Sequence, residues 1–123
     1  GFTLVAEAQD EIGGMDLVFD FDSQSLTLEK VNLGSIDQGF LMESKTAGGV
    51  LRVSLASARG IRLTGSESIL EVPVQFNGTS ASSKDPFRLL EARAYRPDGS
   101  RVEVNLKTIP MSPGGIGGKD TAA

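Results

Sequence analysis

Apolar residues recur at every second position along most of this chain, and this period of two restricts it to a β-sheet fold. The run from Met15 to Phe21 is the plainest case, because its apolar residues alternate with Asp16, Val18 and Asp20. Successive side chains of a strand point to opposite faces, so each run has one buried and one solvated face. The same pattern recurs in the stretches 2–8, 26–31, 51–55, 70–76 and 102–107. Such alternation is typical of antiparallel sheets.

Glycine, proline and aspartate separate these runs at short intervals. Glycine supplies positive φ angles, and an aspartate side chain hydrogen-bonds the backbone just after it. Regular short strands separated by such turn residues predict a sandwich or a barrel. Five residues are expected to shape turns: Gly13, Gly14, Asp22, Asp98 and Gly99.

Two segments leave alternatives open. Residues 87–96 contain good helix formers and follow a candidate helix-capping sequence at 83–86, which would predict a helix. Apolar and polar residues also alternate along this segment, and the hairpin that follows favours a strand. Pro73 interrupts an otherwise strong strand pattern, which predicts an edge position or a bulge.

The length of 123 residues fits one domain, assigned to residues 1–109. Residues 110–123 are dominated by glycine and proline and are expected to form a flexible linker or tail. Because the chain begins at Gly1 without methionine, we interpret it as a piece of a longer protein.

Composition argues against several functions. The chain has no Cys and no His, so it lacks thiol nucleophiles, the commonest general base and the commonest metal ligand. A net charge of −4 without a basic patch argues against nucleic-acid binding. No apolar run reaches the roughly 20 residues that cross a bilayer, so direct membrane insertion is not expected. We therefore expect no catalytic residues, no cofactor and no bound metal.

The aspartates of the run 13–22 have three candidate roles. Calcium needs six to eight oxygen ligands, and the spacing from Asp20 lacks the central glycine and closing glutamate of a calcium loop. A glycosidase needs two acids facing each other across a cleft, and nothing in the sequence indicates one. Asp16 and Asp20 are therefore interpreted as outward residues of a half-buried strand, either solvated or part of a docking face.

Three stretches of the chain resemble cohesin domains. They are EIGGMDLVFDFDSQSLTLEKVNLGS, GGVLRVSLASARGIRLTGSESILEVPVQF and the closing hairpin LLEARAYRPDGSRVEVNL. The matching positions are Gly13, Gly14, Phe21, Asp22, Leu26 and Leu28, then Gly49, Leu51, Val53, Gly65, Leu70, Val72, Val74 and Phe76. The resemblance covers most of residues 2–109.

This resemblance implies an all-β, two-sheet antiparallel sandwich of jelly-roll-like form with about eight to nine strands. It implies a non-catalytic protein–protein interaction module of a multidomain extracellular or cell-surface protein, which docks a dockerin-like partner through one flat sheet face. Two alternatives are a carbohydrate-binding module that takes polysaccharide, and a structural domain of a bacterial or archaeal surface or secretion assembly. Cohesins usually have one more strand before the run 2–8, pairing with the last strand. We expect that strand to be absent here or to lie upstream of this sequence, and its absence would leave an exposed edge.

The family's sheet order implies that the docking face is formed by the runs 15–21, 40–45, 50–57 and 89–95. Their outward residues by alternation give seven candidate partner-binding residues: Asp16, Val18, Asp20, Arg52, Ser54, Glu91 and Arg93.

Overall fold

The computed structural model describes residues 1–34, 39–76 and 87–110, which contain eleven strands and no helix. In chain order they are β1 (Phe2–Glu7), β2 (Ile12–Phe21), β3 (Leu26–Leu28), β4 (Asn32–Leu33), β5 (Leu41–Ala47), β6 (Val50–Ile61), β7 (Thr64–Val72), β8 (Val74–Phe76), β9 (Phe87–Tyr95), β10 (Arg101–Val102) and β11 (Asn105–Pro110). The all-β prediction is confirmed. The count exceeds eight to nine because short strands of two or three residues form where the chain changes sheet.

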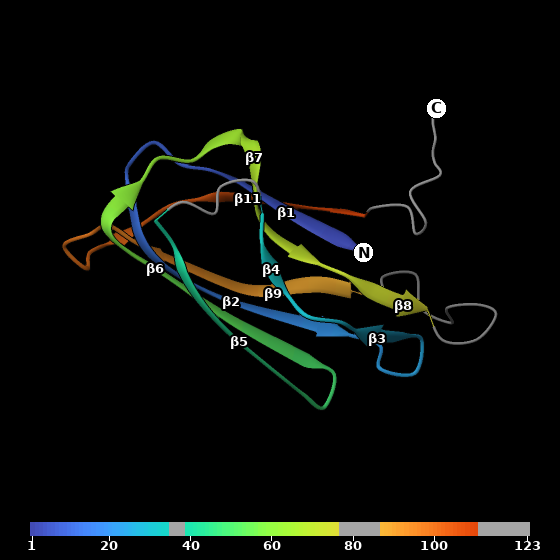
Figure 1. Ribbon diagram of the computed structural model, residues 1–123. Coiled ribbons are helices and arrows are strands. Elements are labelled where there is room, and N and C mark those ends of the chain that lie inside the picture. The colour runs from blue at the N-terminus through green and yellow to red at the C-terminus, as the bar shows by residue number, and fades with distance from the viewer. Residues whose placement is uncertain (35–38, 77–86, 111–123) are drawn as a thin grey trace.

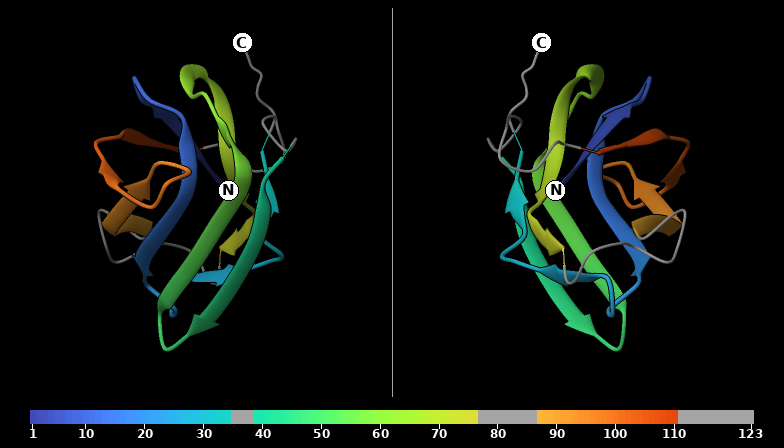
Figure 2. Two further views of the ribbon diagram at one scale, coloured as in Figure 1. Left: turned by 90° about the vertical axis from the view of Figure 1, so that its left-hand side faces the viewer. Right: turned by 90° about the vertical axis from the view of Figure 1, so that its right-hand side faces the viewer.

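The strands form two main antiparallel sheets that face each other (Figure 1). One has the order β11-β1-β7-β4 and the other β10-β9-β2-β6-β5, while β3 and β8 pair in a small third sheet at one end. The two views of Figure 2 show the β5–β6 hairpin reaching past the rest of the sandwich. The fold is therefore an antiparallel β-sandwich, as the alternation predicts.

The core lies between the inner faces, where the alternating apolar residues meet. Met15, Leu17 and Phe19 of β2 are almost completely buried, whereas the residues between them point outward. Three aromatic rings span the two sheets: Phe87 stacks on Phe2 of β1 at 4.5 Å between centroids and on Phe19 at 4.9 Å. Buried aromatic pairs contribute beyond the area they remove from water.

β1 is an interior strand. It pairs with β11 on one side and with β7 on the other, so β11 is the edge of this sheet. The resemblance places a strand before the run 2–8 beside the last strand; in the described residues β1 itself pairs with β11.

Gly13 and Gly14 do not form a turn, and that prediction was wrong. Both lie inside β2, which begins at Ile12, and neither has positive φ. The register of β2 against β6 shifts between Ile12 and Gly14. A Cβ atom on Gly13 would lie 2.5 Å from the Cα of Pro97, so this position needs glycine because the backbone of another segment approaches closely.

The other expectations about the chain have mixed outcomes. Residues 87–95 form a strand, as the hairpin argument favoured, and Pro73 lies where the chain leaves β7 to start β8. Phe76 is 49% exposed, although its alternation predicted burial. Pro110 ends β11, one residue beyond the expected domain boundary, and the rest of the predicted tail lies outside the described residues.

Candidate docking face

The outer face of the five-stranded sheet has a regular arrangement of side chains that follows from its register. Residues paired across antiparallel strands point to the same face. The four rows that cross this face from β5 through β6 and β2 to β9 are Leu41–Ala56–Gly14–Tyr95, Glu43–Ser54–Asp16–Arg93, Lys45–Arg52–Val18–Glu91 and Ala47–Val50–Asp20–Arg88. All seven sequence-predicted residues lie on this one face, in its second, third and fourth rows.

Three of the four acidic side chains in these rows have a partner on the same face. Arg88 donates to Asp20 at 3.1 Å, and Arg93 lies 3.6 Å from Glu91. Ser54 Oγ donates a hydrogen bond of 3.0 Å to Asp16. Exposed pairs of this kind contribute at most about 1 kcal/mol each to stability. Their main effect is to orient the charged groups across the surface.

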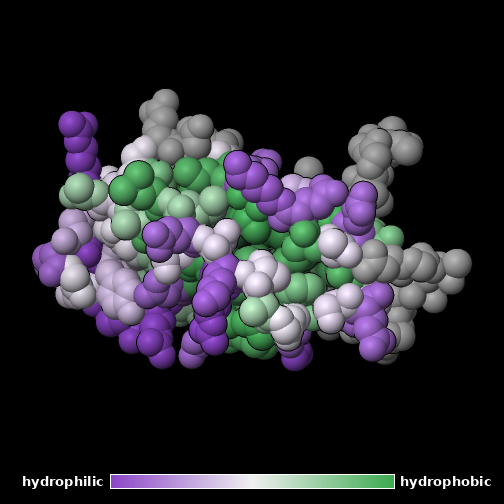
Figure 3. All heavy atoms as spheres, turned by 60° about the horizontal axis from the view of Figure 1, so that its bottom comes forward, coloured by the Kyte–Doolittle hydropathy of each residue, from purple (hydrophilic) through white to green (hydrophobic). Residues whose placement is uncertain are grey.

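The apolar part of the face lies at its centre and at one end. Val18 is partly buried and lies between Arg52 and Glu91 in the third row. At the end of the face, Leu41 is 78% exposed. It borders a shallow groove of about 800 Å³ lined also by Ala56 and Ala58. Viewed from this side, charged side chains are interspersed with pale and apolar ones (Figure 3).

Sequence reasoning missed four residues of this face. It placed a strand near 40–45 but nominated no residue from it, so Leu41, Glu43 and Lys45 were left out. Arg88 was missed because a register shift in β9, between Leu89 and Glu91, changes the alternation there. The signal for the β5 residues was present in the alternation of 41–47, because residues sharing parity share a face.

Two aspartates predicted to shape turns do so through their carboxylates. In the turn after β2, the Asp22 carboxylate accepts the Ser25 hydroxyl at 2.8 Å and the Gln24 amide at 3.0 Å. The hydrogen bond from Ser25, followed by that from Gln24, holds the pKa of Asp22 below its ordinary value. These partners leave Asp22 occupied with the backbone and hydroxyl groups of its own turn.

The hairpin between β9 and β10 is also stabilised by hydrogen bonds to an aspartate carboxylate. The Asp98 carboxylate accepts the hydroxyl of Ser100 at 2.6 Å and its amide at 2.9 Å. These bonds lower the pKa of Asp98, the hydroxyl contributing most. Gly99 follows with φ of +92°, the left-handed conformation that favours glycine.

Within 1–34, 39–76 and 87–110, no group of three or more acidic residues is placed to hold a metal ion. The same residues include no helix with the length and apolar character needed to cross a membrane.

No protein-family model matches this chain, and no curated protein matches it in sequence. Solved structures match it in fold, and the following three are among the cohesin modules that do. A non-cellulosomal cohesin from the hyperthermophilic archaeon Archaeoglobus fulgidus gives a TM-score of 0.63 at 22% identity, covering 82% of this chain and 73% of that chain. The cohesin module of a family 33 glycoside hydrolase from Clostridium perfringens gives a TM-score of 0.60 at 14% identity, and the match covers 88% of this chain and 94% of that chain. The sixth cohesin of scaffoldin B from Acetivibrio cellulolyticus, solved in complex with a dockerin, gives a TM-score of 0.59 at 15% identity. This match covers 83% of this chain and 91% of that chain.

The geometry thus defines an antiparallel β-sandwich with an open outer sheet face. More particularly, the chain has the fold of cohesin modules, and the cohesin resemblance of its sequence is confirmed at that level.

Proposed function

We propose that this domain is a non-catalytic interaction module that binds a dockerin-like protein through the outer face of β9, β2, β6 and β5. The observation that carries the proposal is the four-row face itself, because its strands are those that the cohesin resemblance assigns to docking. The fold is shared with a cohesin solved in complex with a dockerin. Extracellular or cell-surface placement in a larger protein is part of the same proposal.

The composition of the face supports a protein partner. Specific protein interfaces combine a central apolar contact with oriented polar groups around it. Here Val18 occupies the centre, the ion pair of Asp20 with Arg88 lies on one side, and Asp16 with Ser54 lies on the other. These pairs present both signs of charge to a partner, which favours specificity and orientation.

Among the described residues, the alternative of a carbohydrate-binding module gains no support from aromatic side chains. Tyr95 is the aromatic residue in the four rows, whereas Phe19, Phe21 and Phe87 of the same sheet are buried. The exposed Phe76 belongs to the small third sheet. The alternative of a structural domain in a surface or secretion assembly stays a prediction.

Calorimetric titration with the dockerin modules encoded in the same genome tests the proposal. We expect at least one of them to bind, and we expect Val18→Arg to weaken binding at least about tenfold, because a long charged side chain then occupies the centre of the face. Val5→Arg is the matched control, because Val5 is the outward, partly buried residue at a similar place in β1, on the opposite sheet.

The proposal is wrong if none of these modules binds the unsubstituted domain, or if Val5→Arg and Val18→Arg weaken binding equally. Thermal unfolding of both variants shows that the substitutions leave the fold intact.

A further inference from the structure

The outer edge of β5 is a long, regular strand edge in the part of the chain that the structure describes. β5 pairs with β6 over all seven of its residues without a register shift, and it pairs with no other described strand. The other edge strands of the two main sheets are β4 and β10, with two residues each, and β11, which has six residues and ends at Pro110. Unpaired edges are usually blunted by shortness, proline, bulges or charged side chains, because their free N–H and C=O groups recruit other strands. Of these features β5 has only the charged side chains, Glu43 and Lys45.

The turn between β5 and β6 identifies which backbone groups of β5 are free. Gly48 and Gly49 form a two-residue loop with φ of +59° and +78°, and they are flanked by the pair Ala47–Val50. Residues that flank a two-residue hairpin loop exchange both backbone hydrogen bonds, and hydrogen-bonded pairs then alternate along the ladder. The odd-numbered residues of β5 therefore bond to β6. The N–H and C=O groups of Met42, Ser44 and Thr46 point away from the sheet.

The side chains of β5 make this edge complementary to itself. If two copies of β5 pair antiparallel about Ser44, the free groups of Met42 face those of Thr46 in the other copy, and Ser44 faces its own counterpart. In the same arrangement Glu43 lies directly opposite Lys45 of the other copy, and the symmetry repeats this pair. Such positions are non-hydrogen-bonded pairs, in which side chains are closest, and opposite charges there are stabilising.

Neighbouring registers are disfavoured by the same two residues. A shift by two residues in one direction places Glu43 opposite Glu43, and a shift in the other direction places Lys45 opposite Lys45. Like charges directly opposite each other are destabilising. A shift by one residue brings the free backbone groups of one copy against the bonded positions of the other. Charge and hydrogen bonding thus select one register, centred on Ser44.

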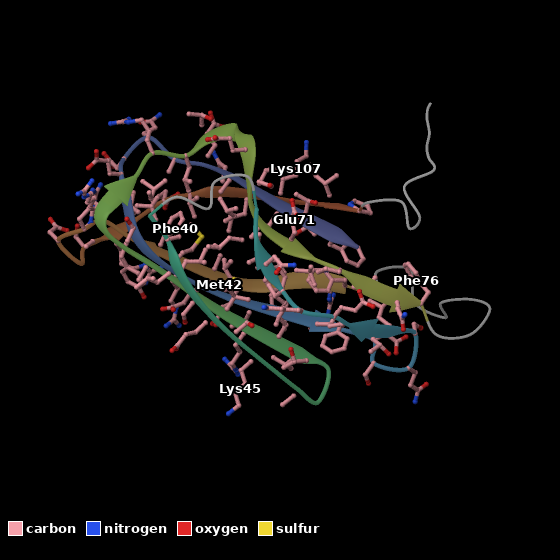
Figure 4. The ribbon with its side chains drawn as sticks, in the orientation of Figure 1. Phe40, Met42, Lys45, Glu71, Phe76 and Lys107 are labelled. Atoms are coloured by element: carbon pink, nitrogen blue, oxygen red, sulfur yellow. The ribbon has the colours of Figure 1, made fainter. Side chains whose placement is uncertain are left out.

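From this edge we infer a second site of association: two copies of this domain pair through β5 to form one continuous ten-stranded sheet. The occupant of the edge is a second copy of this chain, argued from the charge complementarity of Glu43 and Lys45. The contact is isologous, with the two-fold axis normal to the sheet at Ser44. Both outer sheet faces then look to the same side, so the dimer presents two docking faces next to each other. Figure 4 shows Lys45 on the projecting hairpin, away from Lys107 on the opposite layer.

Sedimentation velocity of the domain alone, from about 10 µM to about 500 µM, tests the inference without any partner. We expect a monomer–dimer equilibrium. Glu43→Lys and Lys45→Glu should each raise the dissociation constant at least about tenfold, because each turns attraction into repulsion at both symmetric positions. Ser44→Pro should weaken association similarly, because it removes an outward N–H without touching the bonds to β6.

Two matched controls distinguish a loss of charge complementarity from a disruption of the fold. The double variant Glu43→Lys/Lys45→Glu exchanges the charges and should dimerise like the unsubstituted domain. An equimolar mixture of the two single variants should form heterodimers, because each then faces the opposite charge. A domain that stays monomeric over the whole range overturns the inference. It is also overturned if the single variants dimerise normally, or if the mixture fails to associate. Dockerin binding by the monomer is measured separately, so either proposal can fail alone.

Discussion

At the scale of single residues, period two assigns inside and outside correctly along the long strands β2 and β6, although it wrongly predicts burial for Phe76. In β2, Met15, Leu17 and Phe19 are buried and Asp16 is exposed, as the pattern alone predicts. The rule fails where the chain bulges. Ile69 and Leu70 are adjacent and both fully buried, because β7 shifts register against β1 there. Whether a residue has an odd or even number in its strand can be read from the local sequence. The position of a bulge depends on the partner strand, so the sequence alone does not locate it.

The aromatic stack gives the sharpest residue-scale test of the core. Phe19→Ala removes the ring that stacks on Phe87 at a fully buried site, and it should lower the free energy of unfolding by about 3–5 kcal/mol. Val18→Ala, one residue along, should change it by less than about 1 kcal/mol, because Val18 points outward. Urea denaturation measures both, and equal losses would contradict the inside–outside assignment.

Asp22 gives a residue-scale test with a defined pH dependence. Its pKa is lowered in the folded state by hydrogen bonds that favour the carboxylate. Its stabilising contribution is therefore fully present above its ordinary pKa of 3.8 and is lost as pH falls through the lowered folded value. We expect Asp22→Ala to reduce stability at neutral pH, with the difference from the unsubstituted domain shrinking below about pH 4.

The measurement is denaturant unfolding at a series of pH values. Ser23→Ala, at an exposed position of the same turn, is the control and should show no such pH dependence. A deficit for Asp22→Ala that is constant from neutral to strongly acidic pH would show that its carboxylate does not stabilise the turn.

At the scale of elements, strand positions were predictable and some boundaries were not. Glycines mark both ends and interiors of strands, which is why the sequence assigned Gly13 and Gly14 to a turn that does not exist. In the structure β2 continues through them because β6 and β9 flank it on both sides. By contrast, Gly48 and Gly49 form a true hairpin loop with positive φ at both residues. The difference lies in long-range pairing, which local composition does not contain.

The two glycines of this hairpin should respond oppositely to substitution. No atom lies within 4 Å of a Cβ built on Gly48, and asparagine tolerates positive φ, so Gly48→Asn should stabilise the domain by about 0.4–1 kcal/mol. A Cβ on Gly49 would lie 3.0 Å from the carbonyl oxygen of Phe21, and Gly49→Ala should cost about 1–2 kcal/mol. Thermal unfolding measures both. Changes of the same sign in the two variants would contradict the assigned turn.

At the scale of the whole molecule, the sequence alone gave alternating strands but no sheet order, because pairing joins residues far apart in the chain. The choice of the four strands of the candidate docking face came from the cohesin resemblance, and the structure has these strands side by side as β9-β2-β6-β5. The seven nominated residues share one face for that reason. Leu41, Glu43 and Lys45 were missed although the alternation of 41–47 places them on one face, because no residue of this polar strand was nominated.

Chemical-shift mapping of the isotope-labelled domain, titrated with a dockerin module from the same genome, addresses the docking face as a whole. We expect the largest amide shifts in β9, β2, β6 and β5, centred near Val18, with little change in β11, β1 and β7 on the opposite sheet. Shifts concentrated in β11, β1 and β7 would contradict the assignment, and so would the absence of shifts with every such module.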